Sequence, residues 1–417
     1  MSSNMVISEI NTKETKNQDV PDGYKNTEVG IIPEDWEIFE LAKLSHIETG
    51  STPPTLNREY YGNEFMFVSP GDLGKTKWIS KTEKYLSRKG FNISRKFPAK
   101  SILVACIGST IGKIGMAATK LTSNQQINAI FPNNSILNDF LYYQLSINAN
   151  KIKQKAAEQA VPILNKTKFG EIKIPVPTLK EQNAISTALS DADNLIESLE
   201  KLIAKKQDIK KATMQQLLTG KKRLPGFEGE WEVKRLGDIA HLKKGSGLSK
   251  ADLVTDGTTP CIHYGELFTT YKEKIDKVLN RTNYKGEIFS YKNDVLMPTS
   301  DVTPNGLATA SCLNISDVIL GGDILIIRSS EKVLNGEFLA YSIKVNRKQI
   351  MQLITGTTVF HLYPSNMENF YFQAPPVKEQ NAISNILSDM DAEIETLKQR
   401  LEKTKQIKQG MMQNLLT

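Results

Sequence analysis

Apolar residues recur at alternating steps of four and three in two long segments of the chain, residues 178–220 and 376–417. This spacing places the apolar side chains on one seam of a helix, which is the a/d pattern of a coiled coil. The seam residues are Ile185, Leu189, Ile196, Leu199 and Ile203 in the first segment, and Ile383, Leu387, Met390, Ile394, Leu397 and Leu401 in the second. The alternative is an amphipathic helix that packs only on its own domain.

The charges of the two segments predict how they pair. Each segment is acidic in its first half and basic in its second half, so each complements its own macrodipole. The acidic residues are Asp191, Asp193, Glu197 and Glu200, then Asp389, Asp391, Glu393 and Glu395; the basic residues are Lys201, Lys205, Lys206, Lys210 and Lys211, then Lys398, Arg400, Lys403, Lys405 and Lys408. A parallel pair would place acid beside acid, whereas an antiparallel pair places acid beside base. We therefore predict an antiparallel coiled coil.

The regions ahead of the two segments contain short apolar runs. Residues 101–107 (Ser-Ile-Leu-Val-Ala-Cys-Ile) and 323–327 (Asp-Ile-Leu-Ile-Ile) have the length and the branched side chains of buried strands. The pattern as a whole predicts an α+β protein. Two pseudo-symmetric domains of mixed α/β character are joined by two long helices that form the antiparallel coiled coil.

An internal repeat supports this organisation. Residues 180–186, Lys-Glu-Gln-Asn-Ala-Ile-Ser, return unchanged at 378–384, and the alignment onward to Thr219 and Thr417 holds 22 identities in 40 positions. A second block begins at Trp36 and returns at Trp231. The middle regions, roughly 52–135 and 247–333, align poorly. Two copies of one scaffold with divergent middles suggest one task performed on two different targets.

The repeat sets the predicted boundaries. The parts are a polar N-terminal tail at 1–29, a first domain at 30–177, a central helix at 178–220, a second domain at 221–375 and a C-terminal helix at 376–417. Each domain precedes its helix, so antiparallel helices would relate the domains by a pseudo-two-fold axis. Paired readers of DNA half-sites share that symmetry.

Composition excludes several classes of protein. The chain of 417 residues has a formal net charge of +7 and no apolar run of about 18 residues that would span a membrane. The polar N-terminus does not resemble a signal peptide. The three cysteines are far apart and odd in number, which favours reduced thiols over a disulfide framework. We therefore expect a cytoplasmic protein.

The positive charge is concentrated in one segment of the first domain. Between Lys75 and Lys100 the only acidic residue is Glu83, and four aromatic residues are interleaved with the basic ones. The candidate DNA-binding residues are Lys75, Lys77, Lys81, Lys84, Arg88, Lys89, Arg95, Lys96, Lys100 and Lys113, and in the second domain Lys272, Lys274, Lys277, Arg281 and Lys285. Such a cluster is typical of a phosphate-contacting surface, and the alternative is a solvated lysine-rich face. The second set is diluted by acidic neighbours.

Candidates for reading base edges are polar residues in the divergent middles. They are Ser109, Thr110, Lys113, Asn124, Gln125 and Gln126 in the first domain, and Ser300, Thr303 and Asn305 in the second.

Motifs of catalysis are incomplete. Residues 108–114 resemble a phosphate-binding loop, but the loop is one residue short and Ile114 stands where a hydroxyl residue is required. Glu171-Ile172-Lys173 is too common a triplet to indicate a nuclease. His46 and His241 have no ligand partners at metal spacing, so no metal site is predicted. We expect a non-catalytic chain without a cofactor of its own.

These residues together resemble a known family. Residues 30–37 (Gly-Ile-Ile-Pro-Glu-Asp-Trp-Glu) open the first half, and residues 225–232 (Pro-Gly-Phe-Glu-Gly-Glu-Trp-Glu) open the second. Each half then ends in a Lys-Glu-Gln helix behind a proline-rich segment. In this order the chain resembles, over nearly its whole length, the specificity subunit of type I restriction-modification systems.

The resemblance implies a sequence-specific DNA-binding subunit whose two target-recognition domains each read one half of a bipartite, asymmetric site. It implies two modification subunits, which bring S-adenosylmethionine and dock on the helices, and restriction subunits that use ATP and Mg²⁺. The helices would then set the gap between half-sites. The alternative within this class is the specificity partner of a type IIB-like enzyme. A self-contained nuclease or methyltransferase and a purely structural coiled-coil protein are the alternatives from other classes.

Overall fold

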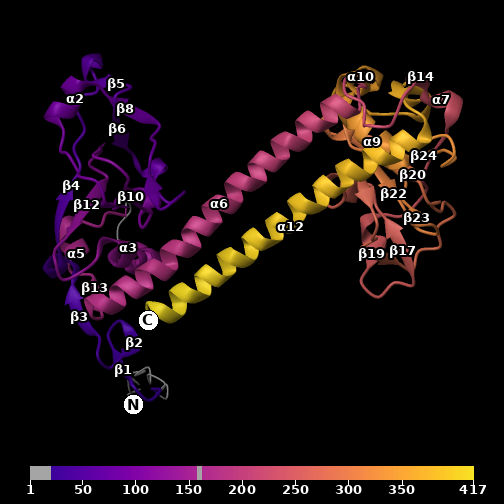
Figure 1. Cartoon of the computed structure of the whole chain (residues 1–417). Coiled ribbons are helices and arrows are strands. Elements are labelled where there is room, and N and C mark those ends of the chain that lie inside the picture. Colours follow the sequence, from indigo (N-terminus) through magenta and orange to yellow (C-terminus); the bar gives the residue numbers. More distant parts are fainter. Residues whose placement is uncertain (1–19, 157–161) are drawn as a thin grey trace, which may run out of the picture. The chain divides into compact units, whose positions relative to one another are not determined.

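The computed structural model describes residues 20–156 and 162–417 (Figure 1). It divides into two compact units, residues 1–198 with 401–417, and residues 199–400. We call these unit 1 and unit 2. Two long helices, α6 (Leu179–Leu217) and α12 (Val377–Leu415), each contribute one part to either unit.

Unit 1 contains two principal sheets. The five-stranded sheet has the order β4 (Ser45–Thr49), β12 (Ile127–Pro132), β9 (Ile102–Ala105), β10 (Ile114–Ala117) and β7 (Trp78–Ile79). All pairs of neighbouring strands in this sheet are antiparallel except β10 and β7, which are parallel. The four-stranded sheet has the order β11 (Thr122–Ser123), β6 (Phe65–Val68), β8 (Lys84–Leu86) and β5 (Tyr61–Gly62). The apolar run at 101–107 contains the central strand β9.

Smaller elements complete unit 1. They are β1 (Tyr24–Thr27), β2 (Gly30–Pro33), β3 (Glu37–Glu40), β13 (Lys173–Val176), the helices α1 (Leu41–Leu44), α2 (Arg88–Ile93), α3 (Asn138–Ile147), α4 (Ala149–Ala156) and α5 (Lys166–Gly170), and the 3-10 turns η1 (Arg58–Tyr60), η2 (Pro70–Asp72) and η3 (Gly108–Thr110). β1 and β2 form a hairpin, which links part of the predicted tail at 1–29 to the first domain. Residues 1–19 of that tail lie outside the described residues. The predicted domain boundaries stay predictions.

Unit 2 repeats the architecture of unit 1. Its elements are β14 (Glu232–Arg235), α7 (Leu236–Ile239), β15 (His241–Lys244), η4 (Lys250–Asp252), β16 (Leu253–Val254), β17 (Thr259–Ile262), α8 (Glu266–Thr269), β18 (Lys274–Ile275), β19 (Asn280–Thr282), β20 (Asp294–Pro298), β21 (Ser300–Asp301), η5 (Gly306–Ala308), β22 (Ser311–Leu313), β23 (Ile319–Leu320), β24 (Ile324–Arg328), α9 (Gly336–Val345), α10 (Arg347–Leu353), β25 (Phe360–His361), α11 (Pro364–Met367) and β26 (Tyr371–Ala374).

The strand orders of the two units are equivalent. The five-stranded order β15-β24-β20-β22-β18 matches β4-β12-β9-β10-β7, again with only the last pair parallel. The four-stranded order β23-β17-β19-β16 matches β11-β6-β8-β5, with the first pair parallel in each. The poorly aligned middles therefore share one topology. Buried strands tolerate exchange among apolar residues of similar volume, so the sequences diverged while the sheets persisted.

A close backbone approach explains one repeated glycine. A Cβ at Gly50 would lie 2.1 Å from the carbonyl oxygen of Asn124, and a Cβ at Gly245 would lie 2.1 Å from that of Gly321. No other residue avoids this clash. The same requirement in both units supports their common architecture.

The ends of the long helices complete the core of each unit. In unit 1 the core cluster around Trp36 and Phe140 includes Ile185 and Leu189 from the start of α6, and also Leu416 from the chain end after α12. In unit 2 the equivalent cluster includes the end of α6 at Leu217 and Leu218 and the start of α12 at Ile383 and Leu387. Each unit thus buries the beginning of one long helix beside the end of the other.

The ion pairs confirm the antiparallel pairing within each unit. In unit 1 Lys408 of α12 lies 2.5 Å from Asp193 of α6. In unit 2 Lys206 and Lys210 of α6 lie 2.6 Å from Glu393 and 2.5 Å from Asp391 of α12. The acidic half of each helix meets the basic half of the other, as the charge pattern predicts.

The predicted seam residues differ in burial. Eight seam residues have less than a tenth of their surface exposed: Ile185, Leu189, Leu199, Ile203, Ile383, Leu387, Ile394 and Leu401. Ile196, Met390 and Leu397 are half-buried. The seam is thus turned inward along most of its length.

The glutamine of the repeated Lys-Glu-Gln motif has a structural role in both units. The Gln182 side chain accepts a hydrogen bond from the backbone N–H of Leu137 at 2.9 Å and donates to the carbonyl oxygens of Ser135 and Pro177. Gln380 makes the same contacts in unit 2, accepting from the N–H of Asn335 at 2.9 Å. Both amides are almost fully buried. The motif therefore ties the start of each long helix to the entry of α3 or α9.

The three cysteines provide a test of burial. All three are free and buried. Burial raises the pKa of Cys106 to about 12 and the pKa of Cys261 to about 11. Only the thiolate is reactive, and a raised pKa lowers its fraction at pH 8. We expect a chromogenic disulfide reagent at pH 8 to modify the folded chain on the order of a hundredfold more slowly than the unfolded chain. Rapid reaction of all three thiols in the folded chain would contradict their placement.

Candidate nucleic-acid interface

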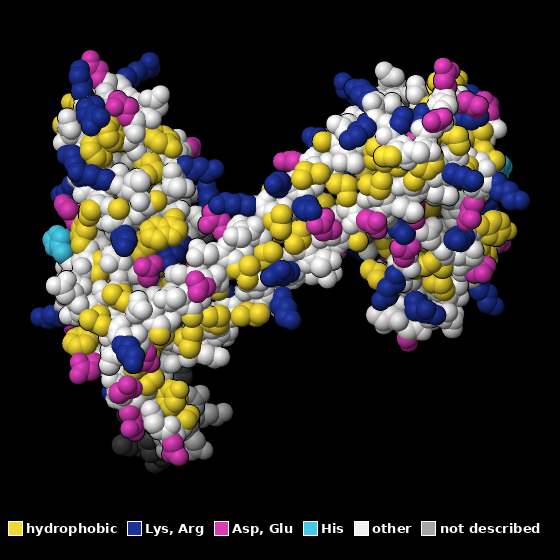
Figure 2. All heavy atoms as spheres, viewed as in Figure 1, with side chains coloured by type: hydrophobic (Ala, Val, Ile, Leu, Met, Phe, Trp, Pro, Cys, Tyr) yellow, Lys and Arg dark blue, Asp and Glu magenta, His cyan; other side chains and the backbone are white. Residues whose placement is uncertain are grey.

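The basic segment of unit 1, residues 75–100, begins just before β7 and ends just before β9, and it includes β7, β8 and α2. In the view of Figure 2, basic side chains gather, with some acidic ones, on the end of unit 1 that carries α2, β5 and β8. The exposed candidates are Lys75, Lys81, Lys84, Arg88, Lys89, Arg95, Lys100 and Lys113. Lys96 is half-buried, its ammonium 2.9 Å from the carbonyl oxygen of Asn92.

Ion pairing separates these candidates into two groups. Lys89 lies 2.9 Å from Glu59, Arg95 lies 3.5 Å from Glu48, and Arg88 lies 4.0 Å from Glu64. The hydrogen bond and the charge of Glu59 raise the pKa of Lys89. Within residues 20–156 and 162–417, five candidates form no ion pair: Lys75, Lys81, Lys84, Lys100 and Lys113. Their charges are the ones most available to phosphate.

Lys77 is placed differently from the prediction. Only 6% of its side chain is exposed, and its ammonium lies 2.5 Å from Asp139. It also donates hydrogen bonds to the hydroxyls of Tyr143 at 3.1 Å and Ser190 at 2.9 Å. A charge engaged in this way cannot reach a phosphate. Lys77 instead links the domain to α6 through its hydrogen bond to Ser190. A local run of basic residues does not reveal which one points inward.

The aromatic residues of this segment also divide. Trp78 is 37% exposed and Tyr85 is half-buried, whereas Phe91 and Phe97 belong to the interior. Phe91 stacks on Phe65 with ring centroids 4.1 Å apart. The four rings come from β7, β8, α2 and the bridge at Phe97. Of these four, Trp78 and Tyr85 are the ones with surface left to meet a ligand.

The candidates of unit 2 are more compensated. Lys272 lies 2.7 Å from Glu395, and Lys274 lies 3.3 Å from Asp276 and 3.4 Å from Glu337. Arg281 donates hydrogen bonds to the carbonyl oxygens of Gly257 and Thr258, both at 2.6 Å. Lys277 and Lys285 are exposed and have no ion-pair partner among the described residues. Fewer candidates of unit 2 are therefore left exposed with no ion pair or backbone contact of their charge, as expected from the acidic residues beside them in the sequence.

The base-reading candidates meet at equivalent places. Ser109 and Thr110 lie in η3, between β9 and β10. Ser300, Thr303 and Asn305 lie between β20 and β22, which is the same connection of the repeated topology. Asn124, Gln125 and Gln126 form a separate turn between β11 and β12, in which the Asn124 side chain donates to Gln126 at 3.0 Å. Ser109 and Thr110 of the first set thus share one structural position with the second set, whereas residues 124–126 do not.

A repeated tyrosine–aspartate–lysine cluster was missed by sequence reasoning. In unit 1 the Tyr143 hydroxyl of α3 donates to Asp193 at 2.7 Å, and Lys408 donates to the same carboxylate at 2.5 Å. Burial raises the pKa of Tyr143, so the phenol stays a donor. One carboxylate therefore joins the domain to both long helices.

Unit 2 contains the equivalent cluster. The Tyr341 hydroxyl of α9 donates to Asp391 at 2.8 Å, and Lys210 donates to it at 2.5 Å. Burial raises the pKa of Tyr341 as well. The equivalence of Tyr143 and Tyr341 is visible in the repeat, but only the structure shows that the lysine comes from the other helix.

Removal of this carboxylate should destabilise unit 2. Replacement of Asp391 by Ala leaves the Lys210 ammonium, whose side chain is 10% exposed, without its principal partner. We expect the free energy of unfolding of unit 2 to fall by about 2–3 kcal/mol, below the value for a fully buried pair because Asp391 is partly exposed. Denaturant titration of the single and double variants of Asp391 and Lys210 measures the coupling. Additive effects would contradict a shared cluster.

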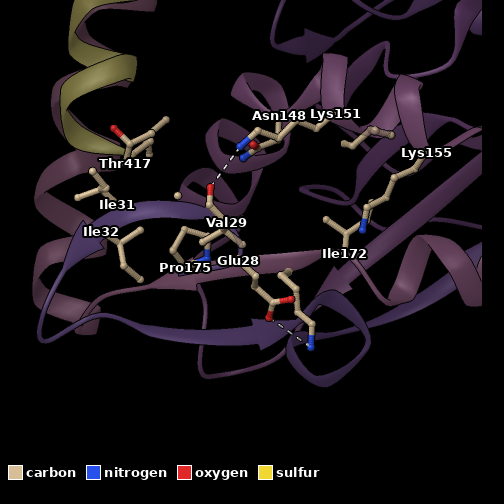
Figure 3. Close-up of a pocket in the computed structure, with 14 residues that line it drawn as sticks. Glu28, Val29, Ile31, Ile32, Asn148, Lys151, Lys155, Ile172, Pro175 and Thr417 are labelled. Carbon is tan, nitrogen blue, oxygen red and sulfur yellow. Dashed lines mark hydrogen bonds and ion pairs between the residues drawn. The ribbon is translucent and has the colours of Figure 1, made fainter. Parts of the chain in front are cut away.

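A pocket of about 280 Å³ lies at the base of unit 1 (Figure 3). It is lined by the β1–β2 hairpin, α4 and the end of the chain at Thr417. Lys151 donates to the carbonyl oxygen of Val29 at 3.3 Å, and Lys173 lies 3.9 Å from Glu28. Two of the lysines that line the pocket are thus held by neighbouring lining residues, Lys151 by the Val29 carbonyl oxygen and Lys173 by Glu28.

A family model decides the identity of the fold. The model of the type I restriction modification DNA specificity domain matches this chain twice, over residues 33–209 and 228–406. The chain belongs to this family. Each match includes one domain and most of the long helix that follows it, so the specificity family accounts for the repeat seen in the sequence and in the strand order.

Named members of the specificity family resemble the chain over most or part of its length. The specificity subunit of the type I restriction enzyme MjaIX from Methanocaldococcus jannaschii is 24% identical over 423 residues, which cover 94% of this chain and 95% of the relative. The HindI specificity subunit from Haemophilus influenzae is 34% identical over 152 residues, covering 35% of this chain and 33% of the relative.

Solved structures share the fold of the specificity family. The crystal structure of the type I restriction-modification S subunit from M. genitalium has a TM-score of 0.62 at 16% identity, and the match covers 92% of this chain and 96% of that one. A structure reported for complex assembly and conformational transition of the type I system has a TM-score of 0.53 at 15% identity and covers 92% and 98%. Among the described helices none combines the length and apolarity needed to cross a membrane.

Proposed function

We propose that the chain is the specificity subunit of a type I restriction-modification complex and reads a bipartite, asymmetric site in double-stranded DNA. The observation that carries this proposal is the duplicated topology with divergent surfaces. The two units share every strand of both principal sheets, yet they differ in charge and in the loops between β9 and β10 and between β20 and β22. A repeated scaffold with different loops is suited to reading two different half-sites.

The chain itself is proposed to be non-catalytic. Methylation and cleavage then belong to partners: two modification subunits that bring S-adenosylmethionine, and restriction subunits that use ATP and Mg²⁺. The names of the relatives, which are specificity subunits of type I restriction enzymes, support this division of labour. We place the complex in the cytoplasm, where it meets DNA. The type IIB-like alternative is not favoured, because the relatives that align over nearly the whole chain are named as type I subunits.

Selection from randomised duplexes tests the proposed function. The chain is assembled with its modification subunits, and the bound duplexes are sequenced over several rounds. We expect two short motifs at a fixed separation, with no preference in the gap. Enrichment of one continuous motif, or of none, would contradict the bipartite reader. Methylation or cleavage by the isolated chain with S-adenosylmethionine and Mg²⁺ would contradict its non-catalytic role.

Exchange of the first domain should change one half-site alone. Residues 30–177 are replaced by the corresponding domain of another specificity subunit, and the same selection is repeated. We expect the motif read by unit 2 to persist unchanged, because its strands and loops are built from residues after 198. A change in both motifs would show that the units do not read independently.

A further inference from the structure

Two loops of unit 2 are held side by side by a short ladder. β21 and β25 pair antiparallel, with Ser300 opposite His361 and Asp301 opposite Phe360. A further bridge joins Thr355 to His361 through backbone hydrogen bonds of 3.0 and 2.7 Å. Residues 299–305 and 355–361 therefore form one small ribbon, which we call the unit 2 ribbon.

The turn of the ribbon has a defined conformation. Gly356 has a φ of +106°, which side chains other than glycine rarely adopt. A Cβ at this position would also lie 2.1 Å from the carbonyl oxygen of Val359. The turn is thus built around glycine and presents its side chains in one arrangement.

The ribbon exposes the methyl and hydroxyl groups of several valine and threonine side chains. Val302 is 72% exposed and Val359 is 44% exposed, while Leu307 and Leu362, which follow the two strands in sequence, are fully buried in the core cluster of unit 2. The threonines of the ribbon that are exposed are Thr303, Thr355, Thr357 and Thr358. The Thr303 hydroxyl donates to the half-exposed carboxylate of Asp301 at 2.9 Å, so it can only accept a hydrogen bond from a ligand. Hydroxyls and methyl groups are the groups that contact base edges and the thymine methyl, and a two-stranded ribbon has the width of a major-groove reader.

His361 adds an oriented ring to this surface. Its Nδ1 lies 2.9 Å from the Ser300 hydroxyl, and its ring stacks on Tyr363 with centroids 5.9 Å apart. The contact at Nδ1 fixes the ring, and in either tautomer Nε2 is the nitrogen left for an outside partner. Within the described part of the chain, the ring makes no second side-chain hydrogen bond.

Unit 1 has the same backbone pairing with different chemistry. Ile107 bridges Ile163 there, at the place where Ser300 faces His361 in unit 2. Ile163 is 43% exposed, so burial in a core does not explain the isoleucine. A purely structural pairing would favour similar residues in both units. An apolar pair in one unit and a hydrogen-bonding pair in the other indicate two different ligands.

Positive charge flanks the ribbon. Arg347, at the start of α10, is exposed and donates to the carbonyl oxygen of Asn305 at 2.9 Å, and its neighbour Lys348 is exposed as well. Cationic side chains beside a base-reading element contact the phosphates and fix its register. The ribbon and its flank therefore combine both kinds of contact.

We propose that the unit 2 ribbon reads base edges of the half-site assigned to unit 2, and that His361 is a specificity-determining residue within it. This inference rests on the proposed function and deepens it by naming the reading element. His361 hydrogen-bonds a base edge through Nε2 while Ser300 holds the ring. The threonines and valines around it complete the contact with neighbouring base pairs.

The test uses the chain assembled with its modification subunits and the selection from randomised duplexes. His361→Ile and Ser300→Ala are compared with the wild type, and His241→Ala, which alters an exposed histidine of the same unit on β15, is the matched control. We expect His361→Ile to reduce discrimination at one base pair of one half-site by about ten- to a hundredfold. The Ser300 variant should reduce the same preference less, and the control should leave both half-sites unchanged.

Three results would overturn the inference. Unchanged preferences in the His361 variant would show that the ribbon does not read DNA. Equal weakening of both half-sites with a lowered melting temperature would assign His361 to the fold. Loss of the modification subunits from the complex would make the ribbon a protein-docking surface. A wild-type complex that selects no two-part motif would instead contradict the proposed function itself.

Discussion

Replacement of Lys75, Lys81, Lys84, Lys100 and Lys113 by glutamine should reduce the affinity of the assembled complex for its DNA by on the order of a hundredfold or more near physiological salt. These exposed lysines have no ion-pair partner among the described residues, so their charges are available to neutralise phosphates. Each phosphate contact releases condensed counterions, and five lost contacts should lower the salt slope of the binding constant by about four to five.

The measurement is a series of equilibrium titrations at several salt concentrations. Lys43→Gln and Lys168→Gln serve as the control, because both lysines are exposed in unit 1 but lie on α1 and α5, outside the basic segment. The variant should lose affinity for cognate and unrelated duplexes alike, since phosphate contacts carry no sequence information. An unchanged salt slope would assign the segment to a solvated face.

Replacement of Leu416 by Ala should lower the free energy of unfolding of unit 1 by about 3 kcal/mol. The side chain is 1% exposed and packs in the same cluster as Trp36 and Phe140. Its carbonyl oxygen also accepts a hydrogen bond from the buried Gln144 side chain at 3.0 Å. Removal of residues 410–417 should be more damaging, since Met411, Met412 and Leu415 also pack against this core.

Denaturant titration of the purified chain measures this effect. Trp78→Phe and Trp231→Phe are introduced into every variant, so that Trp36 is the single tryptophan and its emission reports on unit 1. Thr417→Ala is the control, because Thr417 is exposed and its loss should change stability by less than about 0.5 kcal/mol. Leu416→Met conserves volume and should restore most of the stability. Equal stability of the Leu416→Ala and Thr417→Ala variants would contradict the role of the chain end as part of the core of unit 1.

The helices were accessible from the sequence because their signals are local and periodic. The a/d seam and the graded charges predict two long helices and their antiparallel pairing, and the ion pair of Asp193 with Lys408 confirms it. The apolar run at 101–107 likewise predicts β9, since a buried strand needs only a few consecutive apolar residues.

Other features depend on contacts between distant residues. The common strand order of the two units is hidden by divergent sequences, because a buried strand constrains volume and apolarity more than identity. A repeated hydrogen bond in the turns that follow β6 and β17 was missed for the same reason. The Asp72 carboxylate accepts from the backbone N–H of Ser69, and the Glu266 carboxylate accepts from the backbone N–H of His263, both at 2.8 Å. The two turns are seen to be equivalent only when the strand orders of the two units are compared.

Charge in sequence was the least informative signal about the site. It did not separate the buried Lys77 from its exposed neighbours, nor the core residues Phe91 and Phe97 from Trp78. Which side chains of a short strand or turn face inward depends on pairing partners elsewhere in the chain. The assignment of individual DNA contacts therefore stays a prediction, now limited to the exposed lysines and the loops between equivalent strands.

The most direct test of the account is a genome-wide map of adenine methylation in cells that carry this gene with its partner genes, compared with cells from which this gene alone is deleted. The account predicts that one two-part, asymmetric motif is methylated in the first cells and loses its methylation in the second. Methylation that is unchanged by the deletion would contradict the role of this chain as the subunit that selects the methylated site.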